Sequence, residues 1–335
     1  MTEEVRVYED AAGAAGLADG TLDALRAAGL DAVDVARAVR AALDEDFAYG
    51  PDVTSAATVA GRTVTADVVA REAGVLAGGP VALAVLDLIT GYLEGPAGSR
   101  RAGAWDRAGG RRVSATVLMA DGERIGAGDA VLRVSGPAPA VLGAERTVLN
   151  FLTHLSGIAT ATRAWADAIE GTGAVVRDTR KTTPGLRVLD KYAVRCGGGR
   201  NHRMGLGDAA LIKDNHVAAA GGVAAAVTAV RAAAARRGDA DELVVEVECD
   251  SVAQVREALE AGAHFLLLDN MPLGSIRESV AVARDYYGVR LEASGGLTLA
   301  TAREVAQTGV DYLSVGALTH SARALDLGLD FIDES

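Results

Sequence analysis

The segment 177–213 holds the residues of this chain with the most obvious chemistry. It carries nine lysines or arginines and three aspartates, whereas the whole chain has a formal net charge of -12. Guanidinium groups bind carboxylates and phosphates through paired hydrogen bonds, and lysine supplies a compact positive charge. A basic cluster in an acidic chain therefore indicates a site for a small ligand with several negative groups. The alternative is a solvated basic surface, which remains open for Arg187, Lys191 and Arg195.

Polar residues follow six short apolar runs in the second half of the chain. The runs are 174–176, 209–212, 243–247, 265–268, 289–291 and 312–315. The residues that follow them are Asp178-Thr179-Arg180-Lys181, Lys213, Glu248, Asp269, Ser294-Gly295-Gly296 and Gly316. The carboxyl ends of parallel strands meet on one face of an α/β barrel, so we expect these residues to share one pocket. The alternative is that they only mark the ends of strands.

Two turns that contain glycine favour a phosphate site. Ser294-Gly295-Gly296 and Ser314-Val315-Gly316 close the last two runs, and a helix is predicted just after the first turn. Backbone N–H groups after the last strands of a barrel commonly bind phosphate, helped by a helix N-terminus. Ordinary tight turns are the alternative. The glycines at 197–199, followed by His202 and Arg203, would also let the backbone approach a ligand closely.

Two carboxylates, Glu248 and Asp269, end the two middle runs. They could hold sugar hydroxyls, Mg²⁺ or a developing positive charge, or they could balance the charge of Lys181 or Lys213. Glu246 is expected on the same face as Glu248 because alternate residues of a strand share a face. Together with the anion and phosphate sites, these carboxylates indicate transfer of a phosphorylated sugar. The P-loop and GxGxxG patterns are absent.

The pattern of apolar residues predicts two regions of different architecture. The first 145 residues indicate mixed α and β structure, with helices at 22–43 and 79–93, strands at 64–70, 113–118 and 130–134, and a loop at 94–112. A long helix follows at 145–169. Beyond residue 173, the six apolar runs alternate with helices at 217–237, 251–261, 272–286 and 299–308. This alternation is typical of βα units around a parallel sheet.

Composition excludes several classes of function. A chain this acidic is a poor ligand for nucleic acid or for an anionic membrane surface. No apolar stretch reaches the roughly 20 residues that a membrane span needs, and the acidic start does not resemble a signal peptide. Cys196 and Cys249 are far apart, so we expect neither a disulfide framework nor a zinc site. A cytoplasmic location is the expectation.

Stretches across nearly the whole chain match one known family. They are 179–187, 191–199, 201–203, 211–216, 246–248 and 268–270, together with 145–147, 155–160 and 50–55. In these stretches the chain resembles the quinolinate phosphoribosyltransferases. The resemblance implies an N-terminal α/β sandwich domain (1–145 and 321–335) and an incomplete, TIM-like α/β barrel (146–320). It also implies a homodimer with active sites shared between subunits, or a hexamer built from such dimers.

The resemblance implies a reaction in which quinolinate and phosphoribosyl pyrophosphate give nicotinate mononucleotide, pyrophosphate and CO₂, with Mg²⁺. By matching position, Arg180, His202, Arg203 and Lys213 would hold the two carboxylates of quinolinate, and Arg146 would reach them from the neighbouring subunit. Phosphoribosyl pyrophosphate would be bound by Thr179, Lys181, Glu248 and Asp269. Lys181, Glu248 and Asp269 would also be the catalytic residues, and the two carboxylates would bind Mg²⁺. Ser294, Gly295, Gly296 and Gly316 would hold the 5′-phosphate.

Two other functions remain open at this point. One is a related phosphoribosyltransferase for another aromatic acid, although a monoacid would need fewer cations than this set provides. The other is a non-catalytic protein that binds or senses a phosphosugar. Because the expected chemistry needs orientation and charge placement rather than covalent catalysis, we expect no essential cysteine.

Overall fold

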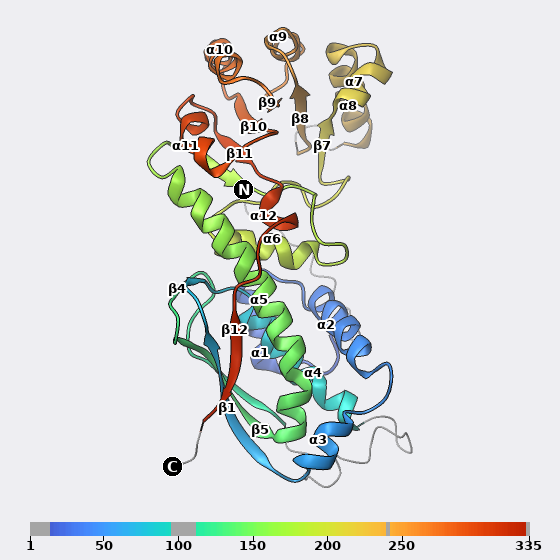
Figure 1. The fold of residues 1–335 in the computed structure, drawn as a ribbon. Helices are drawn as coiled ribbons and strands as arrows, with labels where there is room; N and C mark the ends of the chain where they lie inside the picture. Colours follow the sequence, from blue (N-terminus) through green and yellow to red (C-terminus); the bar gives the residue numbers. More distant parts are fainter. Residues whose placement is uncertain (1–13, 95–111, 239–241, 333–335) are drawn as a thin grey trace. The chain divides into compact units, whose positions relative to one another are not determined.

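The computed structural model describes residues 14–94, 112–238 and 242–332, which fall into two compact units (Figure 1). The first unit comprises Met1–Ala161, Thr183–Gly197 and Ala322–Ser335, and the second comprises Thr162–Thr182 and Gly198–Ser321. The predicted α/β class is confirmed. The domain boundary predicted at 145/146 lies within one long helix, and most of the loop predicted at 94–112 lies outside the described residues.

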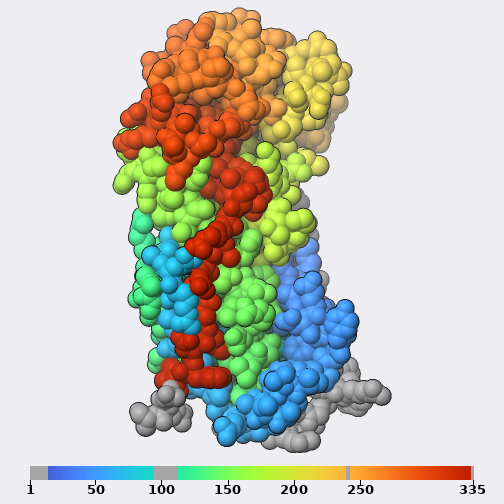
Figure 2. Space-filling view, in the orientation of Figure 1, coloured from blue at the N-terminus to red at the C-terminus, as the bar shows by residue number. Residues whose placement is uncertain are grey.

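An antiparallel sheet forms the framework of the first unit. Its strands lie in the order β12 (Leu327–Phe331), β1 (Thr63–Ala70), β5 (Ala130–Pro137) and β3 (Ser114–Val117). In β1 every second residue from Ala66 to Ala70 is buried, which gives the sheet one core face. The C-terminal segment runs over the surface beside β1 (Figure 2). The sequence pattern missed β12 because the strand is short and half exposed.

Helices complete the first unit. They are α1 (Asp19–Ala27), α2 (Ala32–Phe47), α3 (Val53–Thr58), α4 (Gly79–Glu94), the first part of α5 (Ala138–Ala168) and α6 (Arg187–Cys196). A two-stranded sheet joins β2 (Gly74–Val75) and β4 (Arg124–Ile125). The single helix predicted at 22–43 is wrong. The chain turns at Gly29 with φ 63°, and the Asp31 carboxylate caps α2 by accepting the N–H groups of Val33 and Asp34.

The second unit is built on six parallel strands. Their order is β6 (Val175–Arg177), β11 (Tyr312–Ser314), β10 (Arg290–Ser294), β9 (Phe265–Asp269), β8 (Val244–Cys249) and β7 (Ala209–Ile212). All six apolar runs therefore form the strands that were predicted. Among the described residues, no ladder joins the two outer strands β6 and β7, so the sheet forms an open rather than a closed barrel.

The helices of the second unit follow the strands in the predicted alternation. They are α7 (Asp214–Ala220), α8 (Val223–Arg237), α9 (Val252–Glu260), α10 (Leu273–Ala283), α11 (Leu299–Ala306) and α12 (Ala317–His320). The single helix predicted at 217–237 is wrong. Gly221 and Gly222 have φ 87° and 137°, and the two helices that they separate are bent by 90°. Within the described ranges no single helix meets the length and apolarity of a membrane span, and only this bent pair does so jointly.

Candidate active site

The carboxyl ends of neighbouring parallel strands lie level with one another in the second unit. Asp269 is in register with Ser294, and Ser294 is in register with Ser314. Ser314 is in turn level with Arg177 on β6. The last residues of β9, β10, β11 and β6 therefore form a continuous row at one edge of the sheet, from which the following loops depart.

Lys213 and Glu248 extend this edge on the other side of β9. Ile212 pairs with Val247, so the residues that follow them are neighbours. The Lys213 ammonium lies 2.9 Å from the Glu248 carboxylate, and about half of the lysine side chain (49%) is exposed. The charge balance considered from the sequence is therefore present. The partly exposed ammonium also retains N–H donors that can face a ligand.

The turn after β10 packs against the residue after β9. Gly295 and Gly296 have φ 82° and 62°, and a methyl group at Gly295 would overlap the Asn270 side chain. The Asn270 N–H donates to the Ser294 carbonyl, and its side-chain amide donates to Asp269 at 2.7 Å. Only glycine fits Gly295, because both the positive φ and the close approach exclude a side chain. The Asp269 carboxylate is held beside this turn.

The loops after β6 and β11 also meet. The Thr319 hydroxyl donates to the carbonyl of Lys181 at 2.8 Å. A methyl group at Gly316 would lie 3.1 Å from both Lys181 Cδ and His320 Nε2. His320 therefore lies beside Lys181 and Gly316, although the sequence analysis did not select it. A single histidine in a four-residue helix carries no pattern that could have identified it.

Two arginines of the basic segment lie close enough to affect each other. Burial lowers the pKa of Arg203, and the positive charge of Arg180 lowers it further. Arg203 Nη1 donates to the Ala209 carbonyl at 2.9 Å, whereas its Nε is buried without a hydrogen-bond partner in the structure. Two adjacent guanidinium groups, one with a buried free donor, favour an anion between them.

The backbone around these arginines is fixed by short local contacts. The Thr179 hydroxyl accepts the N–H of Lys181 at 3.0 Å and shapes the turn after β6. The fully buried carboxylate of Asp178 accepts the N–H of His202 at 2.8 Å and the side-chain amide of Asn201 at 2.6 Å. Asp178 thus ties the segment that carries Arg203 to the end of β6.

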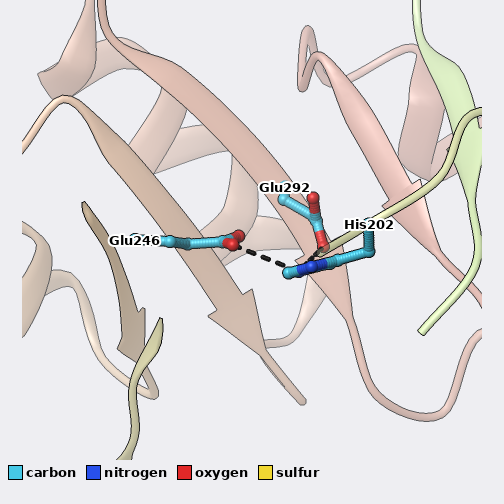
Figure 3. Close-up of side chains that lie close together, drawn as sticks. All are labelled: His202, Glu246 and Glu292. Atoms are coloured by element: carbon cyan, nitrogen blue, oxygen red, sulfur yellow. Dashed lines mark ion pairs between the residues drawn. The ribbon is translucent and has the colours of Figure 1, made fainter. Parts of the chain in front are cut away.

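A buried polar network lies inside the same sheet (Figure 3). His202, Glu246 and Glu292 expose 8%, 2% and 0% of their surface. His202 Nε2 lies 3.1 Å from Glu246 Oε2 and 3.4 Å from Glu292 Oε1. Glu292 also accepts hydrogen bonds from Arg177 and Ser314. Glu292 was missed because the predicted run ends at residue 291, whereas β10 continues to Ser294 and buries this carboxylate, which is rare for glutamate.

Burial controls the protonation of both glutamates. It raises the pKa of Glu246 to about 7, although the charges of Arg177 and Arg203 act in the opposite direction. The pKa of Glu292 is also raised, first by burial and then by the negative charge of Glu246. One oxygen of Glu246 is buried and has no hydrogen-bond partner among the described residues. Ionisation of either carboxyl group therefore makes ionisation of the other less favourable.

Arg146 belongs to the first compact unit, where it lies on α5. It lines a cavity of about 310 Å³ together with Asp46 and Asp52. The other predicted site residues belong to the second unit.

Part of the basic segment is not a solvated surface. Lys191 is fully buried within α6, so that alternative is wrong for this residue, whereas Arg195 is exposed and bonds to the Ala28 carbonyl. Both cysteines are free, and burial raises the pKa of each thiol to about 12. Cys249 is buried and Cys196 is partly buried, so neither provides a thiolate near neutral pH.

Comparison with known proteins assigns both halves of the chain to one family. Residues 52–156 match the N-terminal domain of quinolinate phosphoribosyl transferase, and residues 158–330 match its C-terminal domain. A Mycobacterium leprae protein named nicotinate-nucleotide pyrophosphorylase [carboxylating] is 52% identical over 301 residues, which cover 89% of this chain and 97% of the relative. A probable enzyme of the same name from Bacillus subtilis is 37% identical, covering 85% of this chain and 89% of the relative.

Solved structures agree with this assignment. The nicotinate-nucleotide pyrophosphorylase from Francisella tularensis has a TM-score of 0.76 and 36% identity, covering 89% of this chain and 96% of that protein. The corresponding protein from Ehrlichia chaffeensis has a TM-score of 0.76 and 33% identity, covering 88% and 98%. The similarity therefore includes both the antiparallel sheet and the parallel sheet.

Proposed function

We propose, on the premise that this chain belongs to the quinolinate phosphoribosyltransferase family, that it transfers phosphoribose from phosphoribosyl pyrophosphate to quinolinate. The products are nicotinate mononucleotide, pyrophosphate and CO₂, in the biosynthesis of NAD. The observation that carries the proposal is the gathering of Arg180, Arg203 and Lys213 around the strand ends of a chain whose net charge is -12. Such a local field suits a small substrate with two carboxylates.

Quinolinate would bind to the cations of this edge. The buried Nε–H of Arg203 has no acceptor in the described part of the chain, so a carboxylate there would gain a charge-assisted hydrogen bond. An anion would also relieve the repulsion between Arg180 and Arg203. Lys213 would hold the second carboxylate. His202 belongs to the same site, but its ring nitrogens already contact protein groups.

Phosphoribosyl pyrophosphate would occupy the row of strand ends. We assign Thr179, Lys181, Glu248 and Asp269 to its pyrophosphate and ribose. Its 5′-phosphate would bind at the turns of Ser294, Gly295, Gly296 and Gly316. The turn supports this assignment, since the positive φ of Gly295 and Gly296 is a conformation that glycine adopts without strain and that lets backbone approach a ligand closely.

The carboxylates of Glu248 and Asp269 fit Mg²⁺. They lie at the carboxyl ends of the neighbouring strands β8 and β9, and both offer oxygen atoms, which is the ligand type that Mg²⁺ prefers. Lys213 donates to one oxygen of Glu248, and Asn270 donates to one oxygen of Asp269. The second oxygen of each carboxylate takes no part in these two bonds. Bound Mg²⁺ would supply charge neutralisation for the pyrophosphate.

The chain contributes orientation and charge to the reaction. Cations at Arg180, Arg203 and Lys213 would hold the quinolinate ring so that its nitrogen faces the anomeric carbon of the ribose. The nitrogen forms the new bond as pyrophosphate leaves. The positively charged ring then takes up the electron pair of its bond to the adjacent carboxylate, which departs as CO₂, and a proton from water replaces it on the ring carbon. No step needs a covalent bond to the protein, so placement of the groups provides the rate enhancement.

The decisive experiment measures the products directly. The purified protein is mixed with quinolinate, phosphoribosyl pyrophosphate and MgCl₂, and nicotinate mononucleotide and CO₂ are quantified. Equal amounts of both products are expected, with no product when nicotinate replaces quinolinate. No turnover at micromolar enzyme would refute the proposal. Removal of Mg²⁺ by EDTA should stop turnover, and added MgCl₂ should restore it.

We also propose that the enzyme works as a homodimer in which Arg146 completes the site of the neighbouring subunit. A single active site with one arginine from each subunit has a specific consequence. Arg180→Ala and Arg146→Ala should each be inactive alone. After subunit exchange, the equimolar mixture should recover about a quarter of the wild-type rate, because about half of the dimers are mixed and each mixed dimer has one intact site of two. No recovery after verified subunit exchange would exclude the shared site. A cytoplasmic location stays a prediction.

A further inference from the structure

The network of His202, Glu246 and Glu292 resembles a metal site in its composition, but the proton on the histidine argues for another role. The ligating atoms of the three side chains lie within 4.8 Å of one another. The N–H of Arg203 donates to His202 Nδ1 at 2.7 Å, so Nδ1 carries no proton. In neutral imidazole the proton is then on Nε2, which faces both carboxylates. A protonated Nε2 has no lone pair for a metal.

The same contacts connect the glutamates to the arginine that faces the substrate. His202 Nε2 lies 3.1 Å from the Glu246 carboxylate and 3.4 Å from that of Glu292, and His202 Nδ1 accepts the peptide N–H of Arg203. The orientation of the ring therefore fixes the peptide plane from which the Arg203 side chain departs. The Glu292 carboxylate is itself restrained, since it accepts hydrogen bonds from Arg177 and Ser314.

The segment that carries His202 and Arg203 has little support from regular secondary structure. A single bridge, between Arg177 and Arg200, joins it to the open side of the sheet. Arg177 Nη2 also donates to the Asn201 carbonyl at 3.3 Å. Side chains must therefore supply the rigidity that a closed barrel would obtain from another strand.

We infer that Glu246 and Glu292 are positioning residues of the quinolinate site, which act through His202 to orient the Arg203 guanidinium. This inference rests on the proposed function. It assigns His202 a supporting role behind Arg203 rather than direct contact with the substrate. The oxygen of each carboxyl group serves as a directional acceptor for the Nε2–H group.

Glu246 offers the cleanest test, because its replacement by glutamine or by leucine differs in whether a hydrogen-bond acceptor remains for His202. Glutamine keeps an oxygen that can accept the Nε2–H bond, whereas leucine does not. Glu246→Leu should raise the KM for quinolinate about tenfold and change the KM for phosphoribosyl pyrophosphate by less than about twofold. Glu246→Gln should keep both constants within about threefold of wild type. A glutamine variant that loses as much quinolinate affinity as the leucine variant would overturn the inference.

A double-mutant cycle tests the route through His202. Asparagine at this position can place its oxygen where Nδ1 lies, so His202→Asn keeps an acceptor for the Arg203 N–H and removes Nε2. Glu246→Leu should then have less than about a twofold further effect on the KM for quinolinate. Additive effects of the two changes would show that Glu246 does not act through His202.

Failure of this inference can be distinguished from failure of the proposed function. Wild-type protein that forms no nicotinate mononucleotide refutes the function. Active wild-type protein with an additive cycle refutes only the positioning role. If Glu246→Leu does not fold, the comparison of wild type with Glu246→Gln and His202→Asn, with quinolinate binding measured by calorimetry, still decides the outcome. A glutamine variant that binds quinolinate more than about tenfold weaker than wild type would contradict the role.

Discussion

The strand ends and the interior of the parallel sheet use the same kinds of residue for different purposes. On β8, the buried Glu246 precedes the partly exposed Glu248 by two positions, and on β10 the buried Glu292 similarly precedes Ser294. Residues two apart share a face of a strand, so each strand presents one buried carboxylate and one ligand group in the same direction. The outer groups would contact substrates, and the inner groups hold their supports.

The degree of burial separates the charged groups that bind ligands from the charged groups that hold other residues in position. An exposed ion pair is screened by water and contributes little to stability, whereas a buried charge is costly unless it is paired. Lys213–Glu248 belongs to the first kind, and Arg177–Glu292 belongs to the second. Changes at the strand ends should therefore affect catalysis more than folding, and changes in the interior should affect folding strongly.

The largest effect is expected for Glu292→Ala. Removing this carboxylate leaves Arg177, only 13% exposed, without its ion-pair partner, so the free energy of unfolding should fall by about 3 kcal/mol. Urea denaturation followed by circular dichroism measures this quantity. Lys213→Ala serves as the matched change in a partly exposed pair and should cost less than about 1 kcal/mol. Equal losses in the two variants would remove the distinction between the regions.

The second prediction concerns pH. Because the pKa of Glu246 is raised from 4.5 to about 7, the folded protein binds this proton more tightly than the unfolded chain. This contribution to stability is full below pH 4.5 and is lost as the pH rises through 7. Relative to Glu246→Gln, wild type should therefore lose roughly 3 kcal/mol of stability between pH 4.5 and pH 8.

Urea titrations of both proteins across this pH range measure that difference. Glu248→Gln is the matched control, since the same change is made two residues further along the same strand. Parallel stability curves for wild type and Glu246→Gln would show that the buried carboxyl does not carry the raised pKa.

The third prediction sharpens the contrast at the strand ends. Lys213→Ala should reduce kcat/KM for quinolinate about 100-fold, because one cation of the proposed dicarboxylate site is lost. Its melting temperature should stay within about 2 °C of wild type. Lys213→Arg, which keeps the charge but changes its shape, should recover part of the activity. A loss of activity that follows the loss of folded protein would contradict the assignment.

The smallest effect is expected at the cysteines. Burial raises the pKa of both thiols to about 12, so neither is a nucleophile at neutral pH. Cys196→Ala and Cys249→Ala should retain activity within about twofold of wild type. Steady-state rates, corrected for the folded fraction, provide the measurement. An inactive but folded cysteine variant would require covalent chemistry that the proposed mechanism does not include.

The sequence determined the local elements where patterns are strong. All six apolar runs of the second half form parallel strands, because short buried runs separated by helical stretches have few other solutions. The two wrong helices, at 22–43 and 217–237, both continue a helical pattern across glycine. Periodicity alone does not show that Gly29, Gly221 and Gly222 adopt positive φ.

The chemical character of the site could also be predicted, since cation-rich loops after strands indicate anion binding whatever the details of packing. Only the tertiary structure decided which charges are buried. Lys191 was open to interpretation as a surface residue but is fully enclosed, and Glu292 drew no attention but lies at the centre of the network. Burial depends on neighbours that are distant in sequence, as Arg177 and Ser314 are from Glu292. The sequence therefore predicted which groups would meet an anion, and the fold decided which charged groups are buried behind them.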